Sequence, residues 1–318
     1  MNLKVNIAIA LYNPNLSFFE IQLKSILDQT LRPNKIIFVD DNSSNFEEVK
    51  NIIRSYLCQS EIEYKILKNI KNHGVNFTFR KAYSYLDNGI CFLSDQDDFW
   101  YRNKIEDVVN TYYKNNKPLL IINNCQFYRN NKIDQTISKL EVIKKITGSN
   151  KNFVAGCCTA VDKKIFEFVD YGIFKFLNYD DQLHMIADLL KSRIIIDQPL
   201  QLYRRHDNNV SNSEVNYPIK ERLNFFGIVN KISFKFRYHT YYNYIRMNDQ
   251  DFEDLIKSIK LSNNKTLNQF LKILNAIYYF KKNNSLLNFF KKNQFKNIDS
   301  ILLLIGIIYV KAFKNEKK

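Results

Sequence analysis

The stretch Ile90-Cys91-Phe92-Leu93-Ser94-Asp95-Gln96-Asp97-Asp98-Phe99-Trp100 places three carboxylates directly after an apolar run. A short apolar run of this kind is typical of a buried strand. Open α/β sheets bind ligands at the carboxyl ends of their strands. Clustered carboxylates repel each other unless a cation lies among them, and hard divalent cations prefer oxygen ligands. The stretch therefore indicates either a divalent-cation site or a solvated acidic turn.

The first hundred residues alternate between strand and helix patterns. This β-α-β-α-β-α-β order predicts an α/β fold, with a mostly parallel sheet and helices on both faces. An N-cap for the first helix is expected at Leu16-Ser17, with Glu20 at the capping-box position. Strands are predicted over residues 5–11, 36–39, 62–67 and 90–93, and helices over residues 18–27, 47–57 and 77–86.

Two of these predicted strands end in carboxylates. Asp40 and Asp41 follow the second strand, whereas Asp95, Asp97 and Asp98 follow the fourth. Because the carboxyl ends of parallel strands lie at one edge of a sheet, we expect these side chains to converge on one crevice. The first pair can also cap the helix that follows it. No GxGxxG follows the first strand and no GxxxxGK[ST] occurs, so neither motif explains the crevice.

Further strands are predicted at residues 119–123, 152–161 and 194–196, and a helix is predicted to open near residue 178. Gly156 indicates a close approach of the backbone to a ligand. Asp180 and Asp181 at the helix start fit either chemistry or a favourable interaction with the helix dipole. His206 lies between arginines and a turn-forming segment, which is a poor environment for a core histidine.

The charge is concentrated in the last third of the 318 residues. The net charge is +4 over residues 1–210, whereas residues 211–318 carry 19 Lys and Arg against 8 Asp and Glu. This basic, aromatic region has amphipathic helical patterns. It fits a surface that associates with an anionic membrane, or a helical extension that packs on the first domain. Nucleic-acid binding is not expected, because no known binding module is recognisable.

Five scattered cysteines without CxxC spacing predict buried thiols in a reducing compartment and do not favour zinc. The N-terminus shows no secretory signal, and the apolar run 301–310 is too short to span a bilayer unaided. We therefore expect a cytoplasmic protein, with peripheral attachment to the inner face of the cytoplasmic membrane left open.

Five motifs, in this order, resemble those of family 2 glycosyltransferases with the GT-A fold. Within that family they are most similar to bacterial rhamnosyltransferase-like enzymes and to O-antigen or capsular polysaccharide glycosyltransferases. The chain departs from the usual pattern at Leu11 and Gln182, where Thr and Trp are common. The motifs cover roughly residues 5–211 and are Ala10–Asn13, Phe38–Ser43, Ser94–Trp100, Tyr179–Leu183 and Leu202–Ser211.

The resemblance implies a site for a nucleotide-diphosphate sugar, with a UDP-, dTDP- or GDP-linked donor. Its nucleoside would contact Tyr12, Asn13, Asp40 and Asp41. The resemblance also gives roles to the remaining candidates. The DxD pair Asp95 and Asp97 would bind the ribose and a Mn²⁺ or Mg²⁺ ion, with His206 as a further metal ligand; Asp180 would be the general base, with Asp181 as its rival.

These roles describe an inverting, metal-dependent transfer to a hydroxyl of a growing or lipid-linked glycan. The implied setting is bacterial surface polysaccharide synthesis, of O-antigen, capsule or lipooligosaccharide. Residues 1–211 would form the GT-A catalytic domain, and residues 212–318 a mainly helical region for acceptor or membrane association. A nucleotidyltransferase acting on sugar phosphates and a non-catalytic glycan-binding relative remain alternatives.

Overall fold

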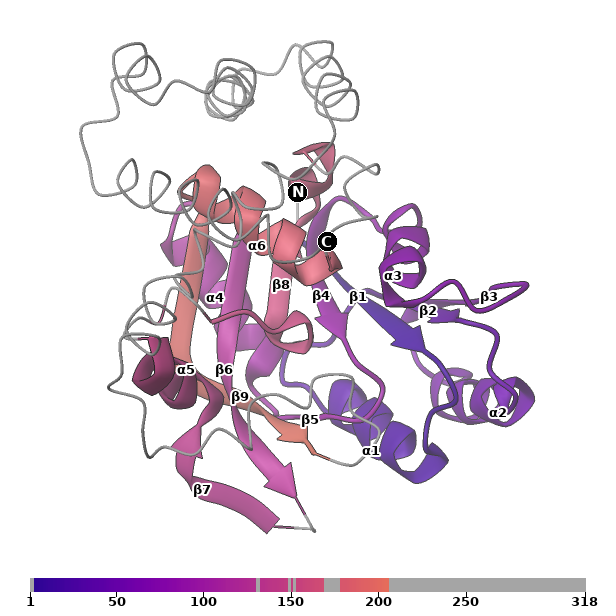
Figure 1. The fold of residues 1–318 in the computed structure, drawn as a ribbon. Helices are drawn as coiled ribbons and strands as arrows, with labels where there is room; N and C mark the ends of the chain where they lie inside the picture. Colours follow the sequence, from indigo (N-terminus) through magenta and orange to yellow (C-terminus); the bar gives the residue numbers. More distant parts are fainter. Residues whose placement is uncertain (1–2, 130–131, 148–149, 151–152, 169–177, 206–318) are drawn as a thin grey trace, which may run out of the picture.

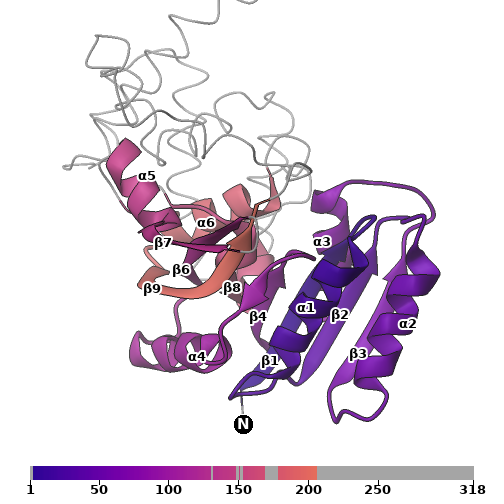
Figure 2. The same ribbon diagram turned by 90° about the horizontal axis from the view of Figure 1, so that it is seen from below.

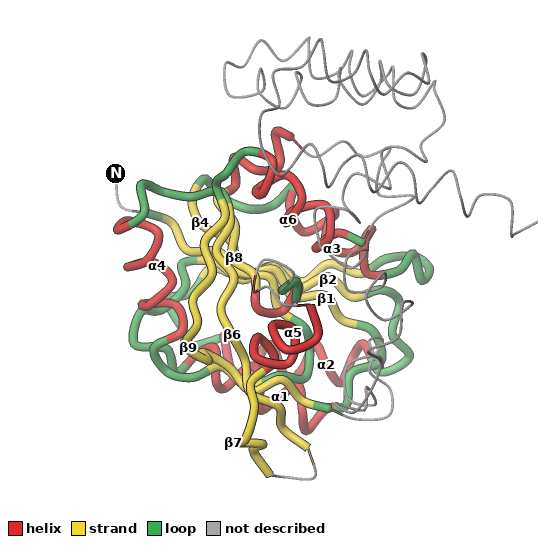
Figure 3. Tube along the Cα trace, turned by 60° about the vertical axis from the view of Figure 1, so that its left-hand side comes forward, coloured by secondary structure: helices red, strands yellow, loops and turns green. Residues whose placement is uncertain are grey.

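The computed structural model describes residues 3–129, 132–147, 150, 153–168 and 178–205. In this part of the chain, one nine-stranded sheet carries helices on both faces (Figures 1 and 3). The strands are β1 Lys4–Leu11, β2 Lys35–Asp40, β3 Glu63–Lys68, β4 Gly89–Ser94, β5 Phe99–Trp100, β6 Leu120–Arg129, β7 Lys132–Ser138, β8 Thr159–Asp162 and β9 Arg193–Arg204. The helices are α1 Leu16–Leu27, α2 Phe46–Leu57, α3 Val75–Tyr83, α4 Lys104–Lys114, α5 Lys139–Thr147 and α6 Tyr179–Leu189, with 3-10 turns η2 Gly156–Cys158 and η3 Lys163–Phe168.

The strand order is β3-β2-β1-β4-β8-β6-β9-β5, with β7 paired to β6. Strands β1 to β4 are mutually parallel where they pair, as the alternating pattern predicted. β8 runs antiparallel to both of its neighbours, and β6 and β9 form a second parallel pair. The first four strands consequently deliver their carboxyl ends to one edge of the sheet.

Alternating side chains of the central strands enter two hydrophobic cores, because successive residues of a strand point to opposite faces. Ile36 and Phe38 of β2 pack in the core beneath α1, α2 and α4, whereas Ile37 and Val39 pack in the core beneath α3, α5 and α6. Figure 2 shows α4 on the opposite side of the sheet from α3, α5 and α6. Burial on both faces explains why these strands read as continuous apolar runs.

Two local predictions were wrong. The N-cap of α1 is Asn15, whose side chain accepts a hydrogen bond from the Phe18 N–H, so Leu16 and Ser17 already belong to the helix. The predicted strand 152–161 is a strand only from Thr159 onward. Its small residues at Gly156–Cys158 form a 3-10 turn that packs against β4.

Several predictions fall outside the described residues. His206, the end of the last motif and the whole region 212–318 belong to this group. Within the part of the chain that the structure describes, no helix is both long and apolar enough to cross a bilayer.

Candidate functional site

The loop after β4 is fixed to β9 through the buried carboxylate of Asp98. Its Oδ1 accepts the backbone N–H of Arg204 at 3.1 Å, and its Oδ2 accepts the side-chain amide of Gln201 at 3.0 Å. Antiparallel pairing of β5 with β9 holds the same loop from its other end. Asp98 therefore orients the loop, and its oxygens are occupied by protein donors.

Asp95 and Asp97 are only partly buried, and they lie at the carboxyl end of β4. Burial, together with the negative charges of Asp97 and Asp180, raises the pKa of Asp95 to about 7. Tyr179 at the start of α6 contacts Gly156, and the sulfur of the adjacent Cys157 lies within 4.8 Å of an Asp95 carboxylate oxygen, so α6 begins beside the β4 loop. The carboxylate pattern at the strand ends did not include Asp180 in the predicted crevice.

The carboxylate oxygens of Asp95 and Asp98 and the Cys157 sulfur lie within 4.8 Å of one another. The hydrogen bond with the Cys158 thiol, followed by burial, raises the pKa of Cys157 well above its usual value, so its thiol stays protonated. A neutral thiol is a poor ligand for a hard cation. Asp95 and Asp97 fit Mn²⁺ or Mg²⁺, because a cation would relieve the repulsion between their carboxylates. Asp98 does not fit, because protein donors occupy its oxygens, and Cys157 does not fit, because its thiol is neutral.

A second wall of the site is the turn after β1. The side chain of Gln96 accepts the Tyr12 N–H at 2.8 Å and donates to the Tyr12 carbonyl at 3.1 Å, which joins this turn to the β4 loop. The Asn13 N–H donates to the Ser43 hydroxyl, and the Asn13 side chain accepts from the Ser44 N–H, both at 2.8 Å. The Tyr12 side chain remains 48% exposed and therefore accessible to a ligand.

Asp40 and Asp41 are buried and support the loops around the site. Asp40 accepts the Ser43 N–H at 2.8 Å. The Asp41 carboxylate accepts the Asn69 side-chain amide at 2.7 Å and the His73 and Gly74 N–H groups at 2.9 and 2.7 Å. Their direct contact with a nucleoside stays a prediction, because the structure assigns both carboxylates first to loop geometry.

The start of α6 is placed by a close contact between Tyr179 and Gly156. A Cβ atom on Gly156 would lie 1.9 Å from the Tyr179 hydroxyl, so only glycine leaves room for this ring. The ring also stacks on Phe79, with centroids 4.2 Å apart. The close approach expected at Gly156 is thus made by a side chain of the same protein, and it sets where Asp180 lies.

Asp180 and Asp181 lie in different environments. Burial, followed by the charge of Asp181, raises the pKa of Asp180 to about 6. The Asp181 carboxylate accepts a hydrogen bond from the Asn178 side chain at 3.3 Å. The raised pKa suits Asp180 to proton transfer near neutral pH, and the choice between Asp180 and Asp181 as base stays a prediction.

Sequence reasoning missed four residues that shape the site. Gln96 lies in the recognised motif, but its bonds to Tyr12 require the fold to be known. The charge of the buried Lys139 partly offsets the rise in the pKa of Asp95 and of Asp180. The buried Lys104 donates to Gln201 and to the Cys157 carbonyl. No local sequence pattern separates these buried lysines from surface lysines. No sequence motif identifies Cys157 as a residue near the site.

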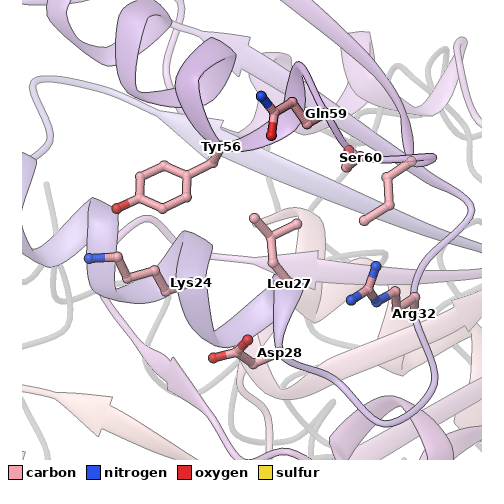
Figure 4. Close-up of a pocket in the computed structure, with 8 residues that line it drawn as sticks. Lys24, Leu27, Asp28, Arg32, Tyr56, Gln59 and Ser60 are labelled. Carbon is pink, nitrogen blue, oxygen red and sulfur yellow. The ribbon is translucent and has the colours of Figure 1, made fainter.

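A separate hollow of about 320 Å³ lies between α1 and α2 (Figure 4). Lys24, Asp28, Arg32 and Tyr56 are among the described residues that line it. It opens near the C-terminal ends of both helices. None of the candidate carboxylates lines it, so we place no catalytic role there.

The family profile described as Glycosyl transferase family 2 matches residues 7–169. The match spans about half of the chain and includes the β4 loop and the turns after β1 and β2. This chain is a family 2 glycosyltransferase.

Relatives of this glycosyltransferase agree with that membership. It is 27% identical to the dTDP-rhamnosyl transferase RfbG of Shigella flexneri over 215 residues, which is 64% of this chain and 73% of the relative. The crystal structure of S. aureus TarS 1-349 in complex with UDP-GlcNAc superimposes with a TM-score of 0.53 at 11% identity, covering 98% of this chain and 81% of TarS 1-349. The longer TarS structure gives a TM-score of 0.54 at 11% identity and covers 99% of this chain and 53% of TarS.

The predicted GT-A fold, glycosyltransferase activity and resemblance to rhamnosyltransferases are thereby confirmed. The roles of the individual site residues and the boundary at residue 211 stay predictions.

Because the pKa of Asp180 is raised in the folded protein, ionisation of Asp180 should lower the free energy of unfolding of this glycosyltransferase. The folded state binds the Asp180 proton more tightly than the unfolded state, so the cost appears as the pH rises through about 6. Asp180→Asn should therefore raise the melting temperature at about pH 8, and should have little effect at about pH 2.5, where Asp180 is largely protonated in both the folded and the unfolded state. Scanning fluorimetry without added metal measures both values.

Asp181→Asn is the matched control: it removes only the charge of Asp181, which contributes less than burial to the raised pKa of Asp180, so its gain should be smaller. A lower melting temperature of Asp180→Asn at about pH 8 would contradict the raised pKa.

Proposed function

We propose that this glycosyltransferase moves a sugar, with inversion, from a nucleotide-diphosphate sugar to a hydroxyl of a growing glycan. The observation that carries this proposal is the packing of the start of α6, which carries Asp180, against the turn Gly156–Cys158, whose Cys157 sulfur lies within 4.8 Å of an Asp95 carboxylate oxygen. The charge of Asp180 also contributes to the raised pKa of Asp95. This arrangement puts a base beside a carboxylate pair suited to a donor diphosphate and its cation.

Asp180 would accept the proton of the acceptor hydroxyl as that oxygen attacks the anomeric carbon. A carboxyl pKa of about 6 keeps Asp180 ionised at neutral pH while leaving it more basic than an ordinary aspartate. The bond from the anomeric carbon to the diphosphate breaks as the new glycosidic bond forms. A single base opposite the leaving group supports direct displacement and hence inversion.

Asp95 and Asp97, together with His206 outside the described residues, would hold the divalent cation. When bound, Mn²⁺ or Mg²⁺ offsets the negative charge that develops on the leaving nucleoside diphosphate. Tyr12 and Asn13 would line the nucleoside side of the pocket, where Tyr12 is exposed.

The relative named as a dTDP-rhamnosyl transferase supports a deoxysugar donor carried on dTDP, within the wider class of UDP-, dTDP- and GDP-sugars. It also supports a role in bacterial surface polysaccharide synthesis, such as O-antigen, capsule or lipooligosaccharide. Membership of the glycosyltransferase family argues against a nucleotidyltransferase. A non-catalytic glycan-binding role would be indicated by donor binding without turnover.

Asp97→Ala should abolish metal-dependent transfer, because it removes one of the two carboxylates proposed to hold the cation. We expect at least a hundredfold loss of turnover, in line with the typical effect of losing a group that stabilises developing charge. The measurement is release of nucleoside diphosphate from a panel of nucleotide sugars with Mn²⁺, Mg²⁺ or EDTA. Full wild-type activity in EDTA would refute the metal role.

Asp180→Asn should retain donor binding and lose transfer, with a rate loss of about a hundredfold to ten-thousandfold. The wild-type rate should fall as the pH drops through about 6, because a protonated Asp180 cannot act as base. Donor binding is measured by calorimetry and transfer by product formation. Asp181→Asn is the paired variant: if it is the inactive one, the base is Asp181.

We propose that residues 212–318 attract an anionic membrane surface, on the strength of their excess of Lys and Arg. All five cysteines are free thiols, which supports a reducing compartment such as the cytoplasmic side of that membrane. The full chain should co-sediment with vesicles containing phosphatidylserine and be released by salt. Equal binding to neutral phosphatidylcholine vesicles would rule out the electrostatic attraction.

A further inference from the structure

The guanidinium of Arg204 contacts two aromatic rings. It lies 4.3 Å from the ring centre of Phe18 on α1 and 4.7 Å from that of Tyr128 on β6. Arg204 is only 6% exposed. Stacking of this kind fixes the plane of a guanidinium, which a lysine ammonium cannot reproduce.

Arg204 also makes two hydrogen bonds to the β4 loop. Its Nε donates to the Asp97 carbonyl at 2.8 Å, and its backbone N–H donates to the Asp98 carboxylate at 3.1 Å. The side-chain bond reaches the main chain of a proposed cation ligand. The backbone bond fixes the end of β9, two residues before His206 in the sequence.

We infer that Arg204 is a positioning residue for the cation site, because it ties the loop that carries Asp95 and Asp97 to the end of β9. The inference rests on the proposed cation site. Metal ligands are commonly oriented by outer hydrogen-bond partners, whose loss weakens metal binding by about ten- to a hundredfold. Here the partner orients the main chain of the ligand-bearing loop.

A purely structural role of Arg204 would affect folding without a specific effect on cation affinity. The experiment therefore measures Mn²⁺ binding directly, by electron paramagnetic resonance of free Mn²⁺ and by quenching of Trp100. Trp100 is the single tryptophan of the chain and lies at the end of the same loop. Circular dichroism and melting temperature report on folding separately.

Arg204→Met keeps an unbranched side chain between Phe18 and Tyr128 but removes the donor to Asp97. We expect its Mn²⁺ dissociation constant to rise about tenfold. Arg204→Lys should show a similar loss, because the charge remains but the planar donor does not. Arg102→Met is the matched control: Arg102 Nε also donates to a backbone carbonyl, that of Asp28 at 3.3 Å, but it lies on the surface, outside the β4 loop contacts. Its Mn²⁺ affinity should equal that of the wild type.

The outcomes separate this inference from the proposed function. If the wild type binds Mn²⁺ and folded Arg204→Met binds it equally well, the positioning role is overturned while the cation site stands. If the wild type binds no Mn²⁺, the cation site fails and the inference with it. If Arg204→Met does not fold, Phe18→Leu, which removes one stacking face, decides: weakened Mn²⁺ binding supports the role and unchanged binding overturns it.

Discussion

The mutual repulsion of carboxylates at the end of β4 is the constraint to which the rest of the site responds. Asp95, Asp97 and Asp98 lie within four residues of a strand buried on both faces, where charge is poorly solvated. The fold resolves the conflict by giving each carboxylate a different environment. Asp98 is satisfied by donors from β9, whereas Asp95 remains under the influence of Asp97 and Asp180. The charge repulsion that remains at Asp95 after folding is what a bound cation would relieve.

The sheet makes this division possible by bringing distant segments to one edge. The parallel register of β1 with β2 and β4 aligns the turns after those strands, and Gln96 then bridges the first turn to the acidic loop. β9 reaches the same edge from the far side of the sheet through its pairing with β6 and β5. The loop is therefore held from both sides, and its geometry depends on residues more than a hundred positions away.

Much of this arrangement could be predicted from the sequence, and the limits have physical causes. Apolar runs such as Ile36–Val39 predicted the parallel strands, because burial on both faces leaves an unambiguous local signal. The region around Gly156 was predicted as a strand because small residues fit either a strand or a tight turn, and only contact with Tyr179 decides. Lys104 and Lys139 could not be found, since burial of a lysine depends on tertiary partners such as Gln201 and Tyr203.

The pair Asp180-Asp181 shows why a motif alone does not assign chemistry. Both residues lie in the first turn of α6, where the helix dipole favours negative charge. Neither the motif nor the helix dipole therefore distinguishes Asp180 from Asp181. The contact of Tyr179 with Gly156 and Phe79 sets the rotation of the first turn. That rotation places Asp180 where burial and the charge of Asp181 raise its pKa to about 6, while the Asp181 carboxylate accepts a hydrogen bond from Asn178. Gly156, which carries no reactive group, thereby helps to set the environment of a carboxylate that lies far from it in the sequence.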